Sequence, residues 1–189
     1  KRELDKFNIK SKFIRGLRVT DDKVINIVES VLIDFNNDIV DSLKKHEVDA
    51  ISLHTKANNI IEVVPEAEEL GYVGIPKKIK NNKLEKILDK KQVPIISPLG
   101  LGENNQTYNI NGDTAAGAIA KSLNSRRLLL MTNVEGVLDE NKRLIEEISS
   151  SEILKMIQNN TITKNTSDTE IKDKEEMKTL DKDNNVQYD

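Results

Sequence analysis

Two segments in which apolar and polar residues do not alternate do most to restrict the fold of this chain. They are Val93–Leu99 (VPIISPL) and Arg126–Thr132 (RRLLLMT). A strand with one face in water alternates apolar and polar residues, whereas a strand covered on both faces is apolar throughout. Both segments are followed by polar residues and then by a helical pattern. We therefore expect an α/β fold in which buried strands form a mostly parallel sheet with helices on both faces.

The remaining elements follow from the spacing of apolar residues. A helical period predicts a long helix from about Asp21 to Lys45, which Thr20 or Asp21 can cap. Ile60–Val64 and Tyr72–Ile75 are predicted to form a hairpin. The other expected elements are a strand over Val48–Leu53, a loop over Gly100–Gln106, and helices over Leu84–Lys90, Asp113–Leu123 and Ser149–Gln158.

Composition and charge exclude several classes of function. The 29 basic and 32 acidic residues are interleaved, with a net charge of −3, so we expect no nucleic-acid partner. The chain has no cysteine, and His46 and His54 do not have the spacing of metal ligands, so no metal site is expected. No apolar run approaches the length of a membrane span, which predicts a cytoplasmic protein without membrane contact.

The end of the chain differs in character from the rest. Half of the residues from Lys164 to Asp189 are charged, and few are large and apolar. Such a segment buries too little surface to offset the entropy of ordering it. We expect 164–189 to be a disordered or poorly packed tail.

A polar turn after the first buried strand is the strongest candidate site. Asn109 and Asn111 are two residues apart, so an extended backbone would point both amides the same way. Amide groups suit a carboxylate or an amide on a small ligand. Asp113 lies at the start of the predicted helix, where it could be a plain N-cap or part of a site.

Two further positions could carry function. Thr132 and Asn133 follow the second buried strand, where they could bind nucleotide phosphate or ribose, or simply form a strand-to-loop turn. Arg18 precedes the long helix and could form bidentate hydrogen bonds with a carboxylate, or could be a solvated surface residue.

The motif YNINGDTAAGAIA, together with MTNVEGVLD, GLRVTD and LGYVGIP, resembles the amino acid kinase superfamily and, within it, the acetylglutamate kinases. The resemblance runs from about Phe13 to Thr163 and implies a kinase-like domain over 1–163. It also implies a three-layer αβα sandwich, with the acyl amino acid held by the amino-terminal half and nucleotide by the carboxyl-terminal half.

The implied reaction moves the γ-phosphoryl group of ATP, with Mg²⁺, onto the side-chain carboxylate of N-acetyl-L-glutamate during arginine biosynthesis. A carboxylate is already a nucleophile at neutral pH, so such a site needs positioning and cationic charge more than a general base. The roles that the resemblance implies are substrate binding by Arg18, Asn109 and Asn111, orientation of catalytic lysines by Asp113, nucleotide contact by Thr132 and Asn133, and a homodimer through the helix 21–45.

Some family features have no counterpart in this sequence. The family's first strand carries a Lys and a Gly-Gly pair, followed by an HGGG-type turn, and a Gly-Gly-Met segment with a second Lys comes later. Nothing before Phe13 matches the first two, and Lys164 follows Thr163 without the third. We therefore expect little or no kinase activity from this chain alone. A related kinase for an aminoadipate-type carboxylate and a non-catalytic ligand-binding member are the alternatives.

Overall fold

The computed structural model describes residues 4, 6, 9, 11–14, 16–131, 136–139, 141 and 143–159. The chain divides into two compact units, Lys1–Ser122 and Leu123–Asp189. The strands are β1 (Phe13–Ile14), β2 (Leu17–Arg18), β3 (Ala50–Leu53), β4 (Ile61–Pro65), β5 (Gly74–Ile79), β6 (Val93–Ile96), β7 (Leu99–Leu101) and β8 (Thr107–Asn109). The α-helices are α2 (Asp22–Lys45), α3 (Asn81–Asp89), α4 (Gly112–Ser122) and α5 (Ser150–Gln158).

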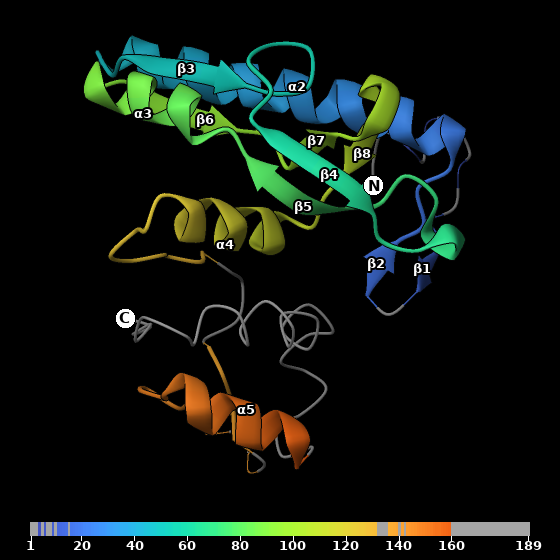
Figure 1. Ribbon diagram of the computed structural model, residues 1–189, viewed down its shortest axis with the longest axis vertical. Helices are drawn as coiled ribbons and strands as arrows, with labels where there is room; N and C mark the ends of the chain where they lie inside the picture. Colours follow the sequence, from blue (N-terminus) through green and yellow to red (C-terminus); the bar gives the residue numbers. More distant parts are fainter. Residues whose placement is uncertain are drawn as a thin grey trace. The chain divides into compact units, whose positions relative to one another are not determined.

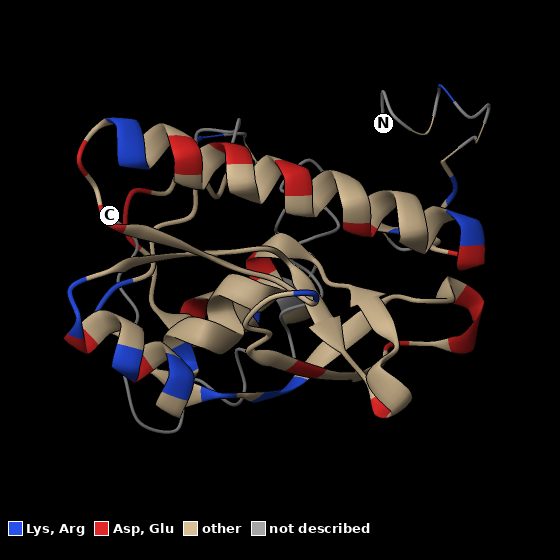
Figure 2. Ribbon diagram, turned by 90° about the horizontal axis from the view of Figure 1, so that it is seen from above, with Lys and Arg blue, Asp and Glu red and all other residues tan. Residues whose placement is uncertain are grey.

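Helix α2 is the longest element and confirms the predicted helix within one residue. Asp21 caps it, because its carboxylate accepts from the backbone N–H groups of Lys23 and Val24, both at 2.9 Å. Acidic residues recur along its length between lysines near each end (Figure 2). Its buried positions include two polar residues, Glu29 and Asn36.

The strands of the first unit pair in a mixed pattern rather than a mostly parallel one. The pairs β3–β6 and β4–β7 are parallel, whereas β4–β5 and β7–β8 are antiparallel. The four-stranded sheet has the order β5-β4-β7-β8. Helix α2 contacts β3, β6 and β8, and α4 contacts β5 on the other side (Figure 1). The α/β class with helices in two outer layers is therefore confirmed, as is the predicted hairpin, although β5 runs further than expected.

The segment Val93–Leu99 is not the single, fully buried strand that its composition predicts. It divides into β6 and β7, which belong to different sheets. Pro98 has no N–H to donate, and Ser97 between the two strands bonds back to the carbonyls of Leu53 and Leu32. Val93 is 42% exposed, so the start of β6 reaches solvent. The expected loop over Gly100–Gln106 is correspondingly shorter, since Gly100 and Leu101 lie in β7.

The other predicted strand, Arg126–Thr132, does not form in the described part of the second unit. Residues 126–131 adopt no strand, and Leu129 and Met131 are 70% and 99% exposed. An apolar run becomes a strand only where a neighbouring strand supplies hydrogen-bond partners. No described strand supplies them here. Helix α5 confirms the predicted helix near 149–158, and its Ile153 is buried.

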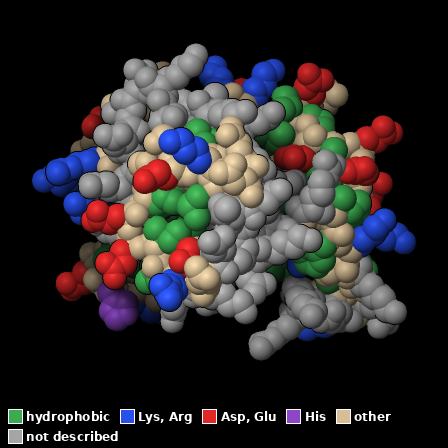
Figure 3. Space-filling view, turned by 90° about the horizontal axis from the view of Figure 1, so that it is seen from below, with side chains coloured by type: hydrophobic (Ala, Val, Ile, Leu, Met, Phe, Trp, Pro, Cys, Tyr) green, Lys and Arg blue, Asp and Glu red, His purple; other side chains and the backbone are tan. Residues whose placement is uncertain are grey.

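The described helices include none long and apolar enough to cross a membrane. On the face drawn in Figure 3, the described basic and acidic side chains are interspersed, as the composition predicts. The predicted tail 164–189 lies outside the described residues.

Candidate functional site

Three segments that are far apart in the sequence lie side by side at the candidate site. The N–H of Tyr72 donates to the carbonyl of Thr20 at 2.7 Å. The N–H of Asn109 in turn donates to the carbonyl of Tyr72 at 2.9 Å. Tyr72 therefore links the backbone that follows Arg18 to the strand that carries Asn109. The sequence motifs predict both Arg18 and Asn109 as substrate ligands, but they do not predict this link.

A small apolar core supports this junction from within. Leu17, Leu70 and Val73 are buried together, with Ile14, Val19 and Ala67 packed against them. Each of the three buried residues lies within three positions of Thr20 or Tyr72 in the sequence. Burial of these side chains holds the two segments in contact.

Gly71 is required for the close approach of these segments. Its φ is +67°, and a Cβ built on it would lie 2.4 Å from the carbonyl oxygen of Thr20. Only glycine adopts this conformation without strain and leaves room for the neighbouring backbone. The first glycine of the motif LGYVGIP is therefore required by the backbone conformation at this position.

Asn111, rather than Asp113, caps helix α4. Its side-chain oxygen accepts from the backbone N–H groups of Asp113 and Thr114, both at 3.0 Å. The helix begins at Gly112, one residue before the predicted start, which moves the cap to Asn111. Asn111 keeps its amide N–H₂ for a ligand. The carboxylate of Asp113 lies in the first turn, where the helix dipole favours negative charge.

Asn109 ends strand β8, so the extended segment does not continue to Asn111. The side-chain amide of Asn109 is half-buried and forms no hydrogen bond with the described part of the chain. No described residue occupies its two donors or its acceptor.

Arg18 is held in place rather than freely solvated. Its guanidinium donates to the hydroxyl of Ser11 and lies over the ring of Phe13, 4.8 Å from the ring centroid. The planar group has five N–H donors, so donors remain for a carboxylate. No described contact joins Arg18 directly to Asn109, Asn111 or Asp113.

Two of the predicted site residues follow the segment Arg126–Thr132 in the sequence or end it. Thr132 and Asn133 lie outside the described residues, so their contact with nucleotide stays a prediction. Across the described ranges, no group of three or more His, Asp or Glu side chains could hold a metal ion.

A buried carboxylate that no sequence pattern predicts lies beside β8. Glu29 on α2 is 9% exposed and accepts hydrogen bonds from the hydroxyls of Thr55, at 2.5 Å, and Thr107, at 2.8 Å. The ammonium group of Lys56 lies 3.5 Å from the second carboxylate oxygen. Burial raises the pKa of Glu29, but the two hydroxyls and Lys56 together lower it below its usual value.

His54 adjoins this carboxylate cluster. It is 8% exposed, and its Nδ1 has no hydrogen-bond partner among the described residues. Burial lowers the pKa of His54 and keeps the ring neutral near pH 7. Backbone bonds between His54 and Ala57, at 2.8 and 3.1 Å, close a tight turn that presents Thr55 and Lys56 to Glu29.

Comparison with known proteins identifies a matching family model and several similar proteins. Residues 1–184 match the model of the amino acid kinase family. The chain is 51% identical to an acetylglutamate kinase of Pelagibacter ubique over 156 residues, covering 82% of this chain and 54% of that protein. It is 41% identical to an acetylglutamate kinase of Rhodospirillum centenum over 174 residues, covering 85% and 57%. The chain thus spans about half the length of the curated relatives it matches.

Solved structures share the fold. The protein smu.665 of Streptococcus mutans superposes with a TM-score of 0.78 at 30% identity, covering 86% of this chain and 66% of that one. An N-acetylglutamate synthase of Neisseria gonorrhoeae, complexed with coenzyme A and N-acetyl-glutamate, superposes with a TM-score of 0.70 at 22% identity. That likeness covers 82% of this chain and 36% of the synthase.

Proposed function

This chain belongs to the amino acid kinase family, and from that premise we propose that it supplies the acetylglutamate site of an acetylglutamate kinase. The proposed reaction transfers the γ-phosphoryl group of ATP to the side-chain carboxylate of N-acetyl-L-glutamate, as a step of arginine biosynthesis in the cytoplasm. The identity to two acetylglutamate kinases supports this choice. The observation that carries it is the backbone link from Thr20 through Tyr72 to Asn109, which brings the proposed ligand segments together.

Each proposed ligand has a chemical role in this reaction. The amides of Asn109 and Asn111 bind the acetylglutamate, and Arg18 binds a carboxylate of the substrate. Asp113 is proposed to orient the lysines that neutralise the transferring phosphoryl group. Because the acceptor carboxylate is ionised at neutral pH, these residues need only hold it in line with ATP.

ATP and Mg²⁺ are the proposed cofactors, with Thr132 and Asn133 near the nucleotide. In kinases Mg²⁺ is held mainly by nucleotide phosphates and only one or two carboxylates. The described residues, which contain no group of three or more metal-ligating side chains, are compatible with an ion that arrives on the nucleotide.

Titration calorimetry with N-acetyl-L-glutamate tests the proposed site. We expect the chain to bind this ligand, and we expect Asn109→Ala to weaken binding about tenfold or more because a buried hydrogen-bonding pair is lost. Thermal stability should stay the same, since the Asn109 amide bonds to no described residue. Asn37→Ala, on the exposed side of α2, is the matched control and should bind as the parent does.

Two results would count against the proposal. The first is no heat of binding for acetylglutamate at millimolar concentration. The second is tighter binding of N-acetyl-aminoadipate than of acetylglutamate, which would favour the longer acceptor. An equal loss of acetylglutamate affinity in Asn109→Ala and Asn37→Ala would show that Asn109 does not bind the ligand.

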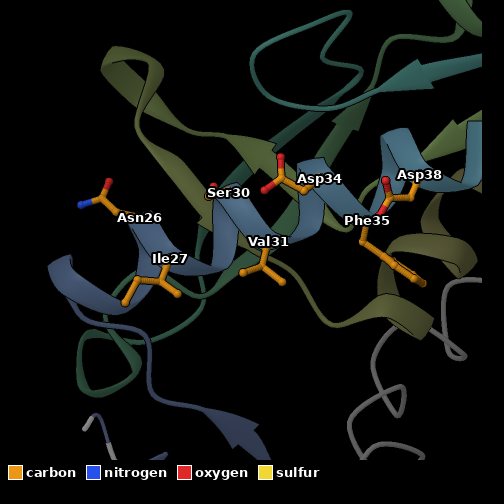
Figure 4. Close-up of a pocket in the computed structure, with 7 residues that line it drawn as sticks. All are labelled: Asn26, Ile27, Ser30, Val31, Asp34, Phe35 and Asp38. Atoms are coloured by element: carbon orange, nitrogen blue, oxygen red, sulfur yellow. The ribbon is translucent and has the colours of Figure 1, made fainter. Parts of the chain in front are cut away.

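The outer face of α2 supports a homodimer as a further part of the proposal. Ile27, Val31 and Phe35 follow one another at helical spacing along a shallow groove on this face (Figure 4). Phe35 is 61% exposed and Val31 is 37% exposed. These residues form a second apolar stripe, distinct from the buried one, and a second copy of the same helix would cover it.

Charge introduced into this stripe should separate the subunits. We expect Phe35→Asp to elute as a monomer in size-exclusion chromatography with light scattering, because a carboxylate would be desolvated in the interface. Leu88→Asp changes a residue of α3 that is 44% exposed and should leave the dimer intact. A monomeric parent chain, or a dimeric Phe35→Asp, would contradict a dimer through α2.

A further inference from the structure

Glu29 ties together three elements around the proposed acetylglutamate site. Helix α2 supplies the carboxylate, and the turn after β3 supplies the hydroxyl of Thr55 and the ammonium group of Lys56. The third donor, the hydroxyl of Thr107, belongs to the first residue of β8. A buried, ionised carboxylate with donors on both oxygens is held more firmly than a neutral hydrogen-bonding group.

Thr107 and Asn109 lie on the same face of β8. Side chains two residues apart in a strand point to the same side, and their Cα atoms are about 7 Å apart. Since Thr107 bonds to α2, the side chain of Asn109 also faces the α2 side of the sheet. Tyr108 between them faces the other way and packs on Gly74 and Gly102.

Backbone pairing with β7 and the bridge from Asn109 to Val73 also restrain β8. It is three residues long, and its register is set by β7 on one side. Asn104 and Asn105, just before it, both have positive φ, so the strand follows an irregular turn. The bond to Glu29 holds the first residue of β8, and the bond to Tyr72 holds the last.

We propose that Glu29 is a positioning residue that, through the hydroxyl of Thr107, fixes β8 and so sets the Asn109 amide for its ligand. This role rests on the proposed function, since it concerns the same site. Glu29 does not touch the substrate. Its effect is transmitted along two residues of strand, where small displacements of a ligating group cost affinity.

The two hydroxyls on Glu29 provide a matched pair of variants. Thr107→Val and Thr55→Val each remove one hydrogen bond to the same carboxylate oxygen, but only Thr107 belongs to β8. We expect both variants to lower the urea midpoint to a similar extent. We expect Thr107→Val to weaken acetylglutamate binding about fivefold, Thr55→Val to weaken it less than about twofold, and Thr107→Ser to restore it.

Equal losses of affinity in Thr107→Val and Thr55→Val would overturn the proposal, because they would reduce Glu29 to a general stabiliser. Unchanged affinity in Thr107→Val would overturn it as well. A spectroscopic measurement without ligand separates this outcome from failure of the proposed function. The side-chain amide signals of Asn109 in a ¹⁵N spectrum, identified by their absence in Asn109→Ala, should move in Thr107→Val and stay in place in Thr55→Val. If they stay in place in both variants, the positioning role is wrong whether or not acetylglutamate binds.

Discussion

Gly71→Ala is expected to lower the free energy of unfolding by about 3 kcal/mol, from the cost of a left-handed backbone at a residue with a Cβ and the cost of overpacking. The φ of +67° and the 2.4 Å approach of a Cβ to the Thr20 carbonyl oxygen both oppose alanine. The backbone at the junction must shift to relieve the contact. Urea unfolding, followed by circular dichroism, measures the loss.

The same substitution should weaken the proposed site. The bond from Tyr72 to Thr20 lies one residue from Gly71, and the next bond reaches Asn109. A shift of this segment would move Asn109 relative to Arg18. Acetylglutamate affinity, measured where the variant is still folded, should fall together with stability.

Gly117→Ala is the control, and we expect it to raise the free energy of unfolding rather than lower it. Gly117 lies inside α4, and a Cβ there would meet nothing within 4 Å. Alanine in a helix interior should raise stability by about 0.5–1 kcal/mol. If both variants changed stability in the same direction, the conformational demand at Gly71 would not be the cause.

Regular patterns in the sequence predict the long elements of this fold well. The period of α2 extends over 24 residues, and Asp21 provides its cap, so little else competes with the helix. What the period does not determine is which side faces the sheet. Phe35 and Val31 fit the helical spacing as well as Val24 and Val40 do, yet the first two are exposed and the last two are buried. Their environment depends on β3, β6 and β8, which are distant in the sequence.

The bounds of short elements depend on single residues, whose effect is not visible in the average composition of a segment. Pro98 lies at the break between β6 and β7. The break is not apparent when Val93–Leu99 is treated as one apolar segment. Asn111 and Asp113 are both good caps, and only the position of the first helical turn decides between them.

Sequence motifs predict residues for the candidate site but not their arrangement. The motifs around Arg18 and Asn109 indicate ligands, whereas the Tyr72 link between them arises from backbone bonds that carry no residue preference. Glu29 escaped prediction because an acidic residue within an amphipathic helix normally faces water. Its partners, Thr55 and Thr107, lie 26 and 78 residues away.

Asn36→Leu is expected to destabilise the fold by about 3 kcal/mol, because a partly buried carbonyl and a partly buried hydroxyl lose their partner. Asn36 is 3% exposed on α2. Its amide N–H₂ donates to the carbonyl of Ile95 in β6 at 2.9 Å, and its oxygen accepts from the hydroxyl of Ser52 in β3 at 2.5 Å. One side chain thus joins the helix to both strands of the parallel pair.

Asn37→Leu provides the matched control, since it makes the same change one residue along the same helix at an exposed position. Its effect should stay within about 0.5 kcal/mol. Leucine has the same number of side-chain heavy atoms as asparagine and a slightly higher helix propensity, so propensity cannot account for a loss at Asn36 alone. Equal urea midpoints for the two variants would mean that apolar burial of leucine replaces the polar link. A large loss confined to Asn36 would identify this amide as the residue that fixes which side of α2 faces the sheet, which the apolar pattern leaves undecided.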